Sequence, residues 1–570
     1  MNTHFANITL SLHIDKWPEP KVNIENECSV SKAIRKYRNH SSILNIQSNI
    51  HVDKEFRFHH IEPDVVITKI KNLNTSKSVG GYLPVSILKE NVNIYAIFLT
   101  DFFNRCVNDG VFPSDMKLAD VIPVFKSGEK TAKENYRPIS LLSSLSKVLE
   151  RIMCDQINDF MINKLSKVLC GFRKKHGAED ALIHLLENWK NHLDNQNIIG
   201  TVLCDLSKAF DTLPHDLIIA KLAAYGFSID ALTLISDYLN DRMQHCKVGS
   251  SFSDWVNLLI GVPQGSVLGP ILFNIFMNYF FMFITQSDVC NFADDTSLYA
   301  HGKTISEVSE KLENDVIRAL DWFKMNSLVP NAKKFQMMFL GTKSKTKLCL
   351  EINGKKCVSS DKVKLLGITI DWKLQFNDHV KALCINANKK VSALMRLRKK
   401  LSLDQKSILF NSFISSQFGY CPIIWMFCGK TTNHLISRVH NRALKALYND
   451  FDSSYTELLA KGNHKTVHDI NLQKLIMKVY KCLNGDCPDI LKDIFVKKQS
   501  LNYNLRISNL LELPKQCSTI TYGLQTFRYR GSATWNTLPD DLKESGSISM
   551  LKKKLKDITI KCSCKICLNS

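Results

Sequence analysis

Two adjacent carboxylates stand at a predicted turn between two strands, and they restrict what can fold around them. The segment Phe292-Ala293-Asp294-Asp295 lies between two short apolar runs, a pattern that predicts a tight hairpin with both acids at its turn. Carboxylates held about 4 Å apart repel by roughly 4 kcal/mol at an effective dielectric constant near 20. This repulsion favours protonation of one acid or binding of a divalent cation. Because turns favour aspartate anyway, the segment alone is also compatible with an ordinary turn.

A third carboxylate, Asp205, stands at the end of another predicted strand, at residues 198–206. If this strand lies beside the hairpin, Asp205 and Asp294 would together hold two Mg²⁺ ions about 4 Å apart, an arrangement suited to phosphoryl transfer. Magnesium prefers a few carboxylates together with phosphate oxygens and water, so two or three acids are enough. The alternative for Asp205 is a strand-end or capping residue.

The size and charge of the chain point to a large nucleic-acid-binding protein. Its 570 residues, 45% of them hydrophobic, are enough for two or three packed subdomains. The net charge of +21 and the pI near 9.2 indicate a polyanionic partner, with nucleic acid as the first candidate. The longest apolar stretch, residues 271–284, is shorter than the roughly 18 residues that span a bilayer. We therefore predict a buried helix there and no membrane partner.

The 18 cysteines are scattered singly through apolar segments, which indicates reduced thiols in an intracellular protein. The first residues carry no secretory signal pattern. Only in the C-terminal tail do cysteines cluster in the sequence. There, Cys562, Cys564 and Cys567 lie close enough to share a zinc ion. A fourth ligand is not apparent nearby. The tail is therefore predicted either to bind zinc or to carry cysteines without a metal.

The pattern along the chain predicts four regions. Residues 1–60 are polar and read as a linker or a truncated upstream region, and residues 61–372 alternate helices with short strands, with a core at 106–372. Residues 373–490 are helical and basic, and residues 491–570 form a mixed region with the cysteine tail. The predicted class is α+β with a mostly helical, basic C-terminal region.

Local signals place several elements. We predict a strand at 118–125, a basic helix near 31–38, and a helix that begins behind the Ser228 cap. Thr304 and Glu307 form a capping-box pattern ahead of a further helix, and Asn353-Gly354 predicts a hairpin. The loop 261–270 brings glycines and Gln264 next to the apolar helix, which suits close approach to a ligand, although taken alone it would be an ordinary loop.

Taken in order, these segments resemble the reverse transcriptases of non-long-terminal-repeat retrotransposons, in the jockey-like or LINE-type group. The resemblance extends from about Lys69 to the tail. It rests on eight ordered runs: residues 119–126, 135–142, 171–173, 205–211, 261–270, 292–296, 331–334 and 365–367.

The resemblance implies a right-hand polymerase, with fingers, palm and thumb, that copies RNA into DNA. Asp205 and Asp294 would bind two Mg²⁺ ions, with Mn²⁺ as the substitute, and Asp295 would be a weaker ligand or a local charge. Lys334 would protonate the leaving pyrophosphate, a role that fits an ammonium near phosphate. The alternative for Lys334 is an exposed lysine at a strand start.

The resemblance also implies a nucleotide site and a primer grip. Lys126 and Arg137 would meet the incoming triphosphate, unless they form a surface ion pair. Phe210 would lie beneath the sugar and exclude a 2′-hydroxyl, unless it is a core residue. Gln264 and Gly265 would contact the template base and the nucleotide. The primer end would be gripped by Leu366 and Gly367, unless this pair is purely structural.

Partners follow from the same resemblance: template RNA, primer DNA, deoxynucleoside triphosphates and nicked target DNA, in the nucleus. The basic helical region would bind the template–primer duplex through its phosphates, although charged faces are usually just solvated. The fingers turn at residues 77–82 departs from the family pattern, and about 60 upstream residues are too few for the family's endonuclease. The alternative is therefore a catalytically decayed remnant that still binds nucleic acid.

Overall fold

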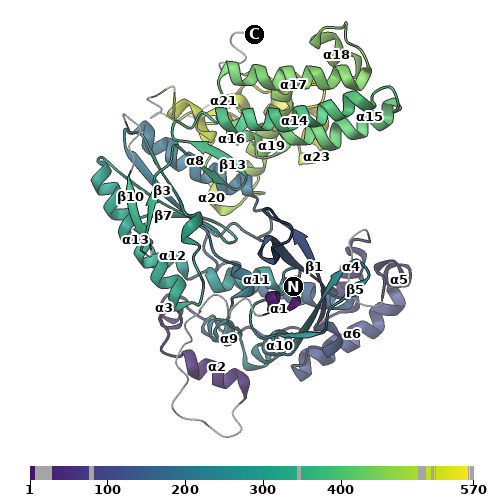
Figure 1. Ribbon diagram of the computed structural model, residues 1–570, viewed down its shortest axis with the longest axis vertical. Coiled ribbons are helices and arrows are strands. Elements are labelled where there is room, and N and C mark those ends of the chain that lie inside the picture. The colour runs from purple at the N-terminus through teal and green to yellow at the C-terminus, as the bar shows by residue number, and fades with distance from the viewer. Residues whose placement is uncertain are drawn as a thin grey trace. The chain divides into compact units, whose positions relative to one another are not determined.

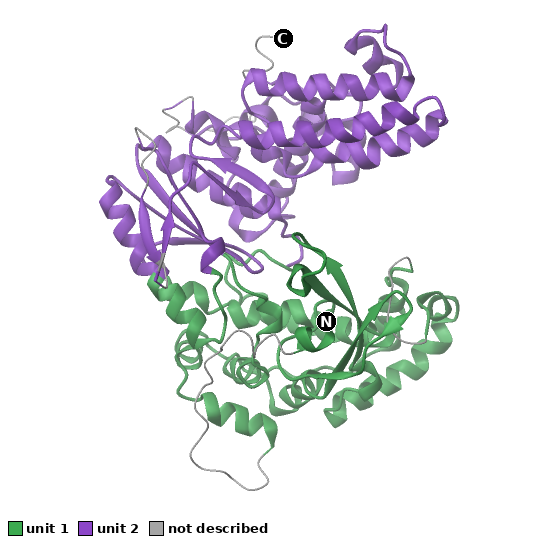
Figure 2. Ribbon diagram, viewed as in Figure 1, with its two compact units in different colours: residues 1–172, 205–285, 317–331 green, residues 173–204, 286–316, 332–570 purple. Residues whose placement is uncertain are grey.

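The computed structural model describes residues 1–6, 28–75, 83–342, 348–352, 354–498, 509–514, 519, 521–562 and 564. The chain divides into two compact units, each assembled from separate segments (Figure 2). The first unit holds residues 1–172, 205–285 and 317–331, and the second holds residues 173–204, 286–316 and 332–570. One of the boundaries falls between Cys204 and Asp205. The units interleave along the chain, whereas the four regions expected from the sequence are consecutive.

The first unit contains a mixed sheet with the strand order β2-β1-β4-β5, and β6 pairs with β4. Its strands are β1 (Leu118–Phe125), β2 (Tyr136–Leu141), β4 (Arg242–Val248), β5 (Ser251–Phe252) and β6 (Val256–Leu258). The β1–β2 pair is antiparallel, whereas β1 and β4 run parallel. The predicted bounds of β1 are confirmed. Val121 and Cys246 on these strands pack with Phe5 in a buried cluster.

The first unit also contains eleven complete α-helices among its described residues (Figure 1). They are α1 (Asn2–Ala6), α2 (Ser29–Tyr37), α3 (Ser41–Asn49), α4 (Pro63–Lys71), α5 (Val85–Glu90), α6 (Val92–Asp109), α7 (Ser144–Met161), α9 (His215–Ala224), α10 (Ile229–Leu239), α11 (Leu268–Met277) and α12 (Phe280–Phe283). The stretch 271–284 is largely buried as predicted, but it forms two helices. The break follows Asn278, whose side chain accepts from the Ser166 amide and donates to the Lys164 carbonyl and the Tyr225 hydroxyl.

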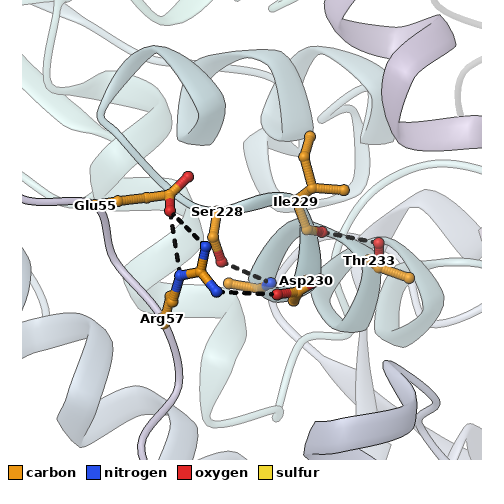
Figure 3. Close-up of polar contacts among 7 residues, drawn as sticks. Glu55, Arg57, Ser228, Ile229, Asp230 and Thr233 are labelled. Carbon is orange, nitrogen blue, oxygen red and sulfur yellow. Dashed lines mark hydrogen bonds and ion pairs between the residues drawn. The ribbon is translucent and has the colours of Figure 1, made fainter.

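Described parts of the first 60 residues are folded onto this unit. Helices α2 and α3 pack against α9, and the predicted basic helix at 31–38 corresponds to α2. Phe56 forms a bridge to Phe227. Figure 3 shows the neighbouring Arg57, which pairs with Glu55 at 3.1 Å and with Asp230 at 3.5 Å. We expected a linker or a truncated upstream region here, and these contacts tie its described parts to the start of α10.

The start of α10 follows the predicted cap. The Ser228 hydroxyl accepts the amide of Ala231 at 3.2 Å (Figure 3), and Leu232, Ile235 and Leu239 are buried. Ile229, which helical spacing places on the same apolar face, is half exposed, because it lies in the first turn at the edge of that face. The serine-capped helix is confirmed.

The second unit contains an antiparallel four-stranded sheet with the order β7-β8-β3-β9. These strands are β3 (Ile198–Cys204), β7 (Asp288–Phe292), β8 (Asp295–Gly302) and β9 (Gln336–Leu340). Helix α13 (Ile305–Met325) reaches one face, where a Cβ on Gly200 would meet Val308 and Leu312 within 2.8 Å. Helix α8 (Ala178–Asp194) packs on β3 and β7, with Trp189 against Tyr299. Since Gly200 is paired with Ala300, Tyr299 points to the opposite face, and the two helices cover both sides.

Two hairpins and a set of helices complete this unit. The hairpins are β10 (Cys349–Ile352) with β11 (Lys355–Val358), and β12 (Lys362–Leu365) with β13 (Ile368–Asp371). The helices are α14 (Asn377–Leu397), α15 (Leu403–Leu409), α16 (Pro422–Trp425), α17 (Lys430–Tyr448), α18 (Tyr455–Lys461), α19 (Val467–Leu483), α20 (Asp489–Lys492), α21 (Phe527–Asn536), α22 (Asp540–Lys543) and α23 (Ile548–Lys554). Figure 1 shows α14 and α17 packed side by side. The mixed α+β class and a largely helical region after β13 are thus confirmed.

Two further local predictions have mixed outcomes. The pairing of Ile352 with Lys355 closes the predicted hairpin at 353–354, although residue 353 lies outside the described residues. The Thr304 hydroxyl accepts the Glu307 amide at 3.2 Å as predicted, but the Glu307 carboxylate accepts from the amide of Lys303 instead of Thr304. No helix in the described part of the chain is long and apolar enough to cross a membrane.

Candidate functional site

The adjacent carboxylates lie at the turn of the β7–β8 hairpin. Phe292 pairs with Asp295, so Ala293 and Asp294 form a two-residue turn, as the sequence predicts. Ala293 has a φ of 58°, a left-handed conformation that costs a residue with a side chain about 1–2 kcal/mol. Asp294 is exposed at the tip and Asp295 is partly exposed at the start of β8. The hairpin therefore presents both carboxylates at one end of the second unit's sheet.

A buried asparagine holds this turn in shape. The amide Nδ2 of Asn291 donates to the Ala293 carbonyl at 2.9 Å and to the Thr296 hydroxyl at 3.0 Å. Asn291 is 1% exposed, so these bonds form away from water. The sequence gives only one signal for Asn291, which is its position one residue before the predicted turn.

Strand β3 ends level with the carboxylate hairpin. In the β3–β8 register, Cys204 lies opposite Thr296 and Leu203 lies opposite Ser297. Asp205 is the next residue after Cys204 along the chain, although it belongs to the first unit. The predicted strand at 198–206 is therefore too long by two residues.

The first unit holds the backbone on either side of Asp205 by other contacts. The Asp205 carbonyl accepts the amide of Asn331 at 2.8 Å, and Leu206 forms a bridge with Pro330. These bonds take the chain away from the β8 ladder, which explains the early end of β3. The Asp205 side chain is partly exposed.

Lys334 lies at the same end of the second unit's sheet. It closes a short 3₁₀ helix, Ala332–Lys334, two residues before β9. Gln336, the first residue of β9, lies opposite Leu203 near the end of β3. Lys334 is exposed. Its position agrees both with a lysine that protonates pyrophosphate and with an ordinary lysine at the start of a strand.

In the first unit, the predicted loop at 261–270 is bound to an acidic side chain. The Nε2 amide of Gln264 donates to both carboxylate oxygens of Asp211, at 2.8 and 2.9 Å. Burial raises the pKa of Asp211 to about 6, against the opposing effects of Gln264 and Lys208. The sequence alone predicts no role for Asp211, because its partner lies 53 residues away.

Backbone contacts fix the same loop on both sides. A Cβ on Gly261, whose φ is 86°, would lie 2.8 Å from the backbone of Asp211. A Cβ on Gly265, whose φ is 133°, would lie 2.4 Å from the Ser140 carbonyl oxygen. Both positions therefore require glycine. The Gln264 carbonyl accepts the Ser140 amide at 2.8 Å, so the loop is joined to the end of β2.

Phe210 is part of an aromatic cluster. Its ring stacks on Phe273 with centroids 4.7 Å apart and meets the edge of Phe172 at 5.6 Å. It is only partly buried, so one part of the ring remains available to a ligand. Phe210 therefore packs within this cluster without being fully buried, and the nucleotide role stays a prediction.

Lys126 and Arg137 lie on one face of the β1–β2 hairpin. Arg137 pairs with Val124, and the Lys126 amide donates to the Asn135 carbonyl opposite it. Side chains two residues apart on a strand share a face, and paired residues share it too, so both cations point the same way. Both are exposed, and within the described chain neither forms an ion pair. The surface-ion-pair reading therefore finds no support.

Leu366 and Gly367 form the turn of the β12–β13 hairpin, with φ values of 47° and 79°. The Tyr420 hydroxyl donates to the Leu366 carbonyl at 2.7 Å, and a Cβ on Gly367 would lie 3.4 Å from the Tyr420 ring. Burial, with the charges of Cys421 and Asp295, raises the pKa of Tyr420 to about 12. Tyr420 thus braces this turn from the helical region, a role that sequence reasoning missed.

Comparison with known proteins agrees with the resemblance seen in the sequence. A family model described as reverse transcriptase (RNA-dependent DNA polymerase) matches residues 126–370. These residues form a reverse transcriptase domain. Every residue predicted above from Lys126 to Gly367 lies inside this domain, whereas Cys562, Cys564 and Cys567 lie outside it.

Curated relatives of the chain come from transposons and mobile elements. The probable RNA-directed DNA polymerase from transposon BS of Drosophila melanogaster is 28% identical over 403 residues, which are 68% of this chain and 44% of the relative. The RNA-directed DNA polymerase from the mobile element jockey of the same species is 26% identical over 61% of this chain and 40% of the relative. The chain thus spans less than half the length of these relatives.

Proposed function

We propose that the chain is an RNA-directed DNA polymerase that copies retrotransposon RNA by two-metal nucleotidyl transfer in target-primed retrotransposition. The observation that carries the proposal is the register of the second unit's sheet. Cys204 lies opposite Thr296, so the strand that leads into Asp205 ends beside the turn that bears Asp294 and Asp295. Paired residues on antiparallel strands have Cα atoms about 4.5–5.5 Å apart.

The carboxylate set suits magnesium. Asp205 and Asp294 would bind the two ions, and Asp295 would act as a weaker ligand or a local charge. Carboxylate oxygens with water and phosphate are the environment that Mg²⁺ prefers, and Mn²⁺ accepts the same ligands. When bound, the ions would act as Lewis acids on the attacking hydroxyl and the leaving pyrophosphate. Asn291 would keep the two hairpin carboxylates in place between catalytic cycles.

Lys334 would supply a proton to the leaving pyrophosphate. Its position before β9 supports this role, because β9 begins at the sheet end where β3 stops and β8 starts. An ammonium near phosphate both neutralises charge and donates a proton.

The first unit would bind the incoming deoxynucleotide. Lys126 and Arg137 present two cations on one strand face, where the guanidinium fork suits triphosphate oxygens. Gln264 and Gly265 would contact the template base and the nucleotide, with Asp211 as the positioning residue that orients the Gln264 amide. The partly exposed Phe210 ring, held by Phe273, would lie beneath the sugar.

The second unit would bind the primer and the duplex. The Leu366–Gly367 turn would grip the primer end, with Tyr420 behind it. The helical region after β13 would form the thumb, and its exposed cations, such as Lys381, Lys389 and Lys399, would bind the phosphates of template RNA and primer DNA. Nicked target DNA would supply the primer in the nucleus.

Primer extension on an RNA template with deoxynucleotides and Mg²⁺ tests the proposal. Wild type should extend the primer, whereas Asp205→Asn and Asp294→Asn should each lose extension yet still bind the template–primer duplex. Glu351→Gln, an equal charge change at an exposed site on β10, is the matched control and should remain active.

Equal extension by wild type and Asp294→Asn would contradict the catalytic proposal. A wild-type chain that folds and binds the duplex but never extends it would instead identify a catalytically decayed remnant.

A further inference from the structure

A histidine and two cysteines from distant parts of the chain gather beside α19 in the second unit. One ligand atom from each of His468, Cys562 and Cys564 lies within 4.8 Å of the others. The sequence shows the cysteines but not the histidine, which precedes Cys564 by 96 residues. Cys567, the third cysteine of the tail, lies outside the described residues.

The separation of the ligand atoms fits a shared zinc ion. The Sγ of Cys564 lies 3.5 Å from the Nε2 of His468. A tetrahedral zinc with bonds of about 2.3 Å to sulfur and about 2.0 Å to nitrogen holds such a pair of ligand atoms about 3.5 Å apart. Thiolate and imidazole ligands select zinc over magnesium, so this cluster differs in chemistry from the carboxylate site.

Without a metal, the two ring nitrogens of His468 have poor hydrogen-bond partners. His468 is 8% exposed and Cys564 is 1% exposed. Among the described residues, the Nδ1 of His468 has no hydrogen-bond partner, and its Nε2 meets the Cys564 sulfur. A thiol is a weak hydrogen-bond donor, and burial of a polar ring with weak partners is costly. Coordination of the ring to zinc would replace this weak contact with a strong bond.

The surrounding scaffold holds the ligands in place. The Thr466 hydroxyl caps α19, so His468 lies in a fixed first turn. On either side of it, Lys465 donates to the carbonyls of Leu555 and Ile558 at 3.0 Å, and Gln473 donates to the Leu555 carbonyl at 2.5 Å.

A further bond fixes the residue before the first cysteine. The Thr537 hydroxyl donates to the Lys561 carbonyl at 3.2 Å. The tail that carries Cys562 is therefore already seated along α19, and metal binding requires little further ordering of the chain.

We propose that His468, Cys562 and Cys564 bind one Zn²⁺ ion, which clasps the C-terminal tail to α19. The ion would join the start of α19 to the C-terminal tail, independently of the polymerase reaction. Three protein ligands leave one coordination position for a further donor.

Metal analysis of the purified full chain tests the proposal. Wild type should contain about one zinc per chain, whereas His468→Gln, Cys562→Ser and Cys564→Ser should each lose it. The control Cys349→Ser changes an exposed thiol on β10 and should keep the zinc. Replacement by Co²⁺ in wild type gives a second measurement that needs no variant: thiolate-to-cobalt absorption should appear, and added zinc should remove it.

Two results would overturn the proposal. One is a reduced wild-type chain that neither retains zinc nor binds added zinc or cobalt. The other is a Cys564→Ser chain with a full zinc content, which would leave the sulfur–imidazole contact as a hydrogen bond alone.

Discussion

Replacement of Asn291 should loosen the carboxylate hairpin selectively. Asn291→Ala removes two buried hydrogen bonds, to the Ala293 carbonyl and the Thr296 hydroxyl, each worth about 1 kcal/mol net. It also leaves buried acceptors unsatisfied, which costs about 1–3 kcal/mol more. The left-handed turn at Ala293, already strained by about 1–2 kcal/mol, loses the side chain that holds it. The lost bonds and the unsatisfied acceptors together give about 3–5 kcal/mol of local destabilisation.

Amide hydrogen exchange measures this loss where it occurs. Peptides from the β7–β8 hairpin should exchange about 100- to 4,000-fold faster in Asn291→Ala, because each 1.4 kcal/mol is a factor of ten. Thr296→Val, which removes one of the two bonds and keeps the shape, should have a smaller effect of about 1 kcal/mol. Primer extension should fall in parallel as the carboxylates lose their position. Unchanged exchange in the hairpin, or equal acceleration throughout the chain, would refute this reasoning.

Two other predictions concern residues that position the site. Because burial raises the pKa of Asp211 from 3.8 to about 6, ionisation destabilises the fold as pH rises from about 4 to about 6. Asp211→Asn should therefore gain stability relative to wild type by up to ~3 kcal/mol between pH 4 and pH 7, as measured by denaturant unfolding. Tyr420→Phe loses the bond to the Leu366 carbonyl and should raise the KM for the primer–template duplex several-fold with kcat retained. A pH-independent stability difference would contradict the first prediction. For the second, the contrary result is a change in kcat alone, or an equal effect of Tyr95→Phe on α6.

The sequence predicts the local elements well because their signals are local. The strand at 118–125, the Ser228-capped helix and the carboxylate hairpin each depend on a few neighbouring residues. The end of β3 was misplaced because Asp205 and Leu206 bond to residues 330–331, far away in the chain. The break after Asn278 depends similarly on remote partners.

The residues of the candidate site also fall into two groups, those that the sequence indicates and those that only the fold brings together. The motifs single out the acids at 205, 294 and 295 as candidate metal ligands, because a metal site requires their chemistry. The motifs give no signal for Asp211, Tyr420 and His468, whose proposed roles depend on partners 53, 54 and 96 residues away. Such contacts form only when the chain folds, and a single sequence carries no record of them.

The most direct test of the account asks whether Asp205 and Asp294 share one metal centre. Fe²⁺ bound in place of Mg²⁺ to the complex with template, primer and nucleotide generates hydroxyl radicals that cleave the nearby backbone when ascorbate and peroxide are added. The account predicts cleavage both near residue 205 and near residue 294, suppressed by excess Mg²⁺ and absent from Asp294→Asn. Cleavage near only one of these segments, or its persistence in Asp294→Asn, would contradict it.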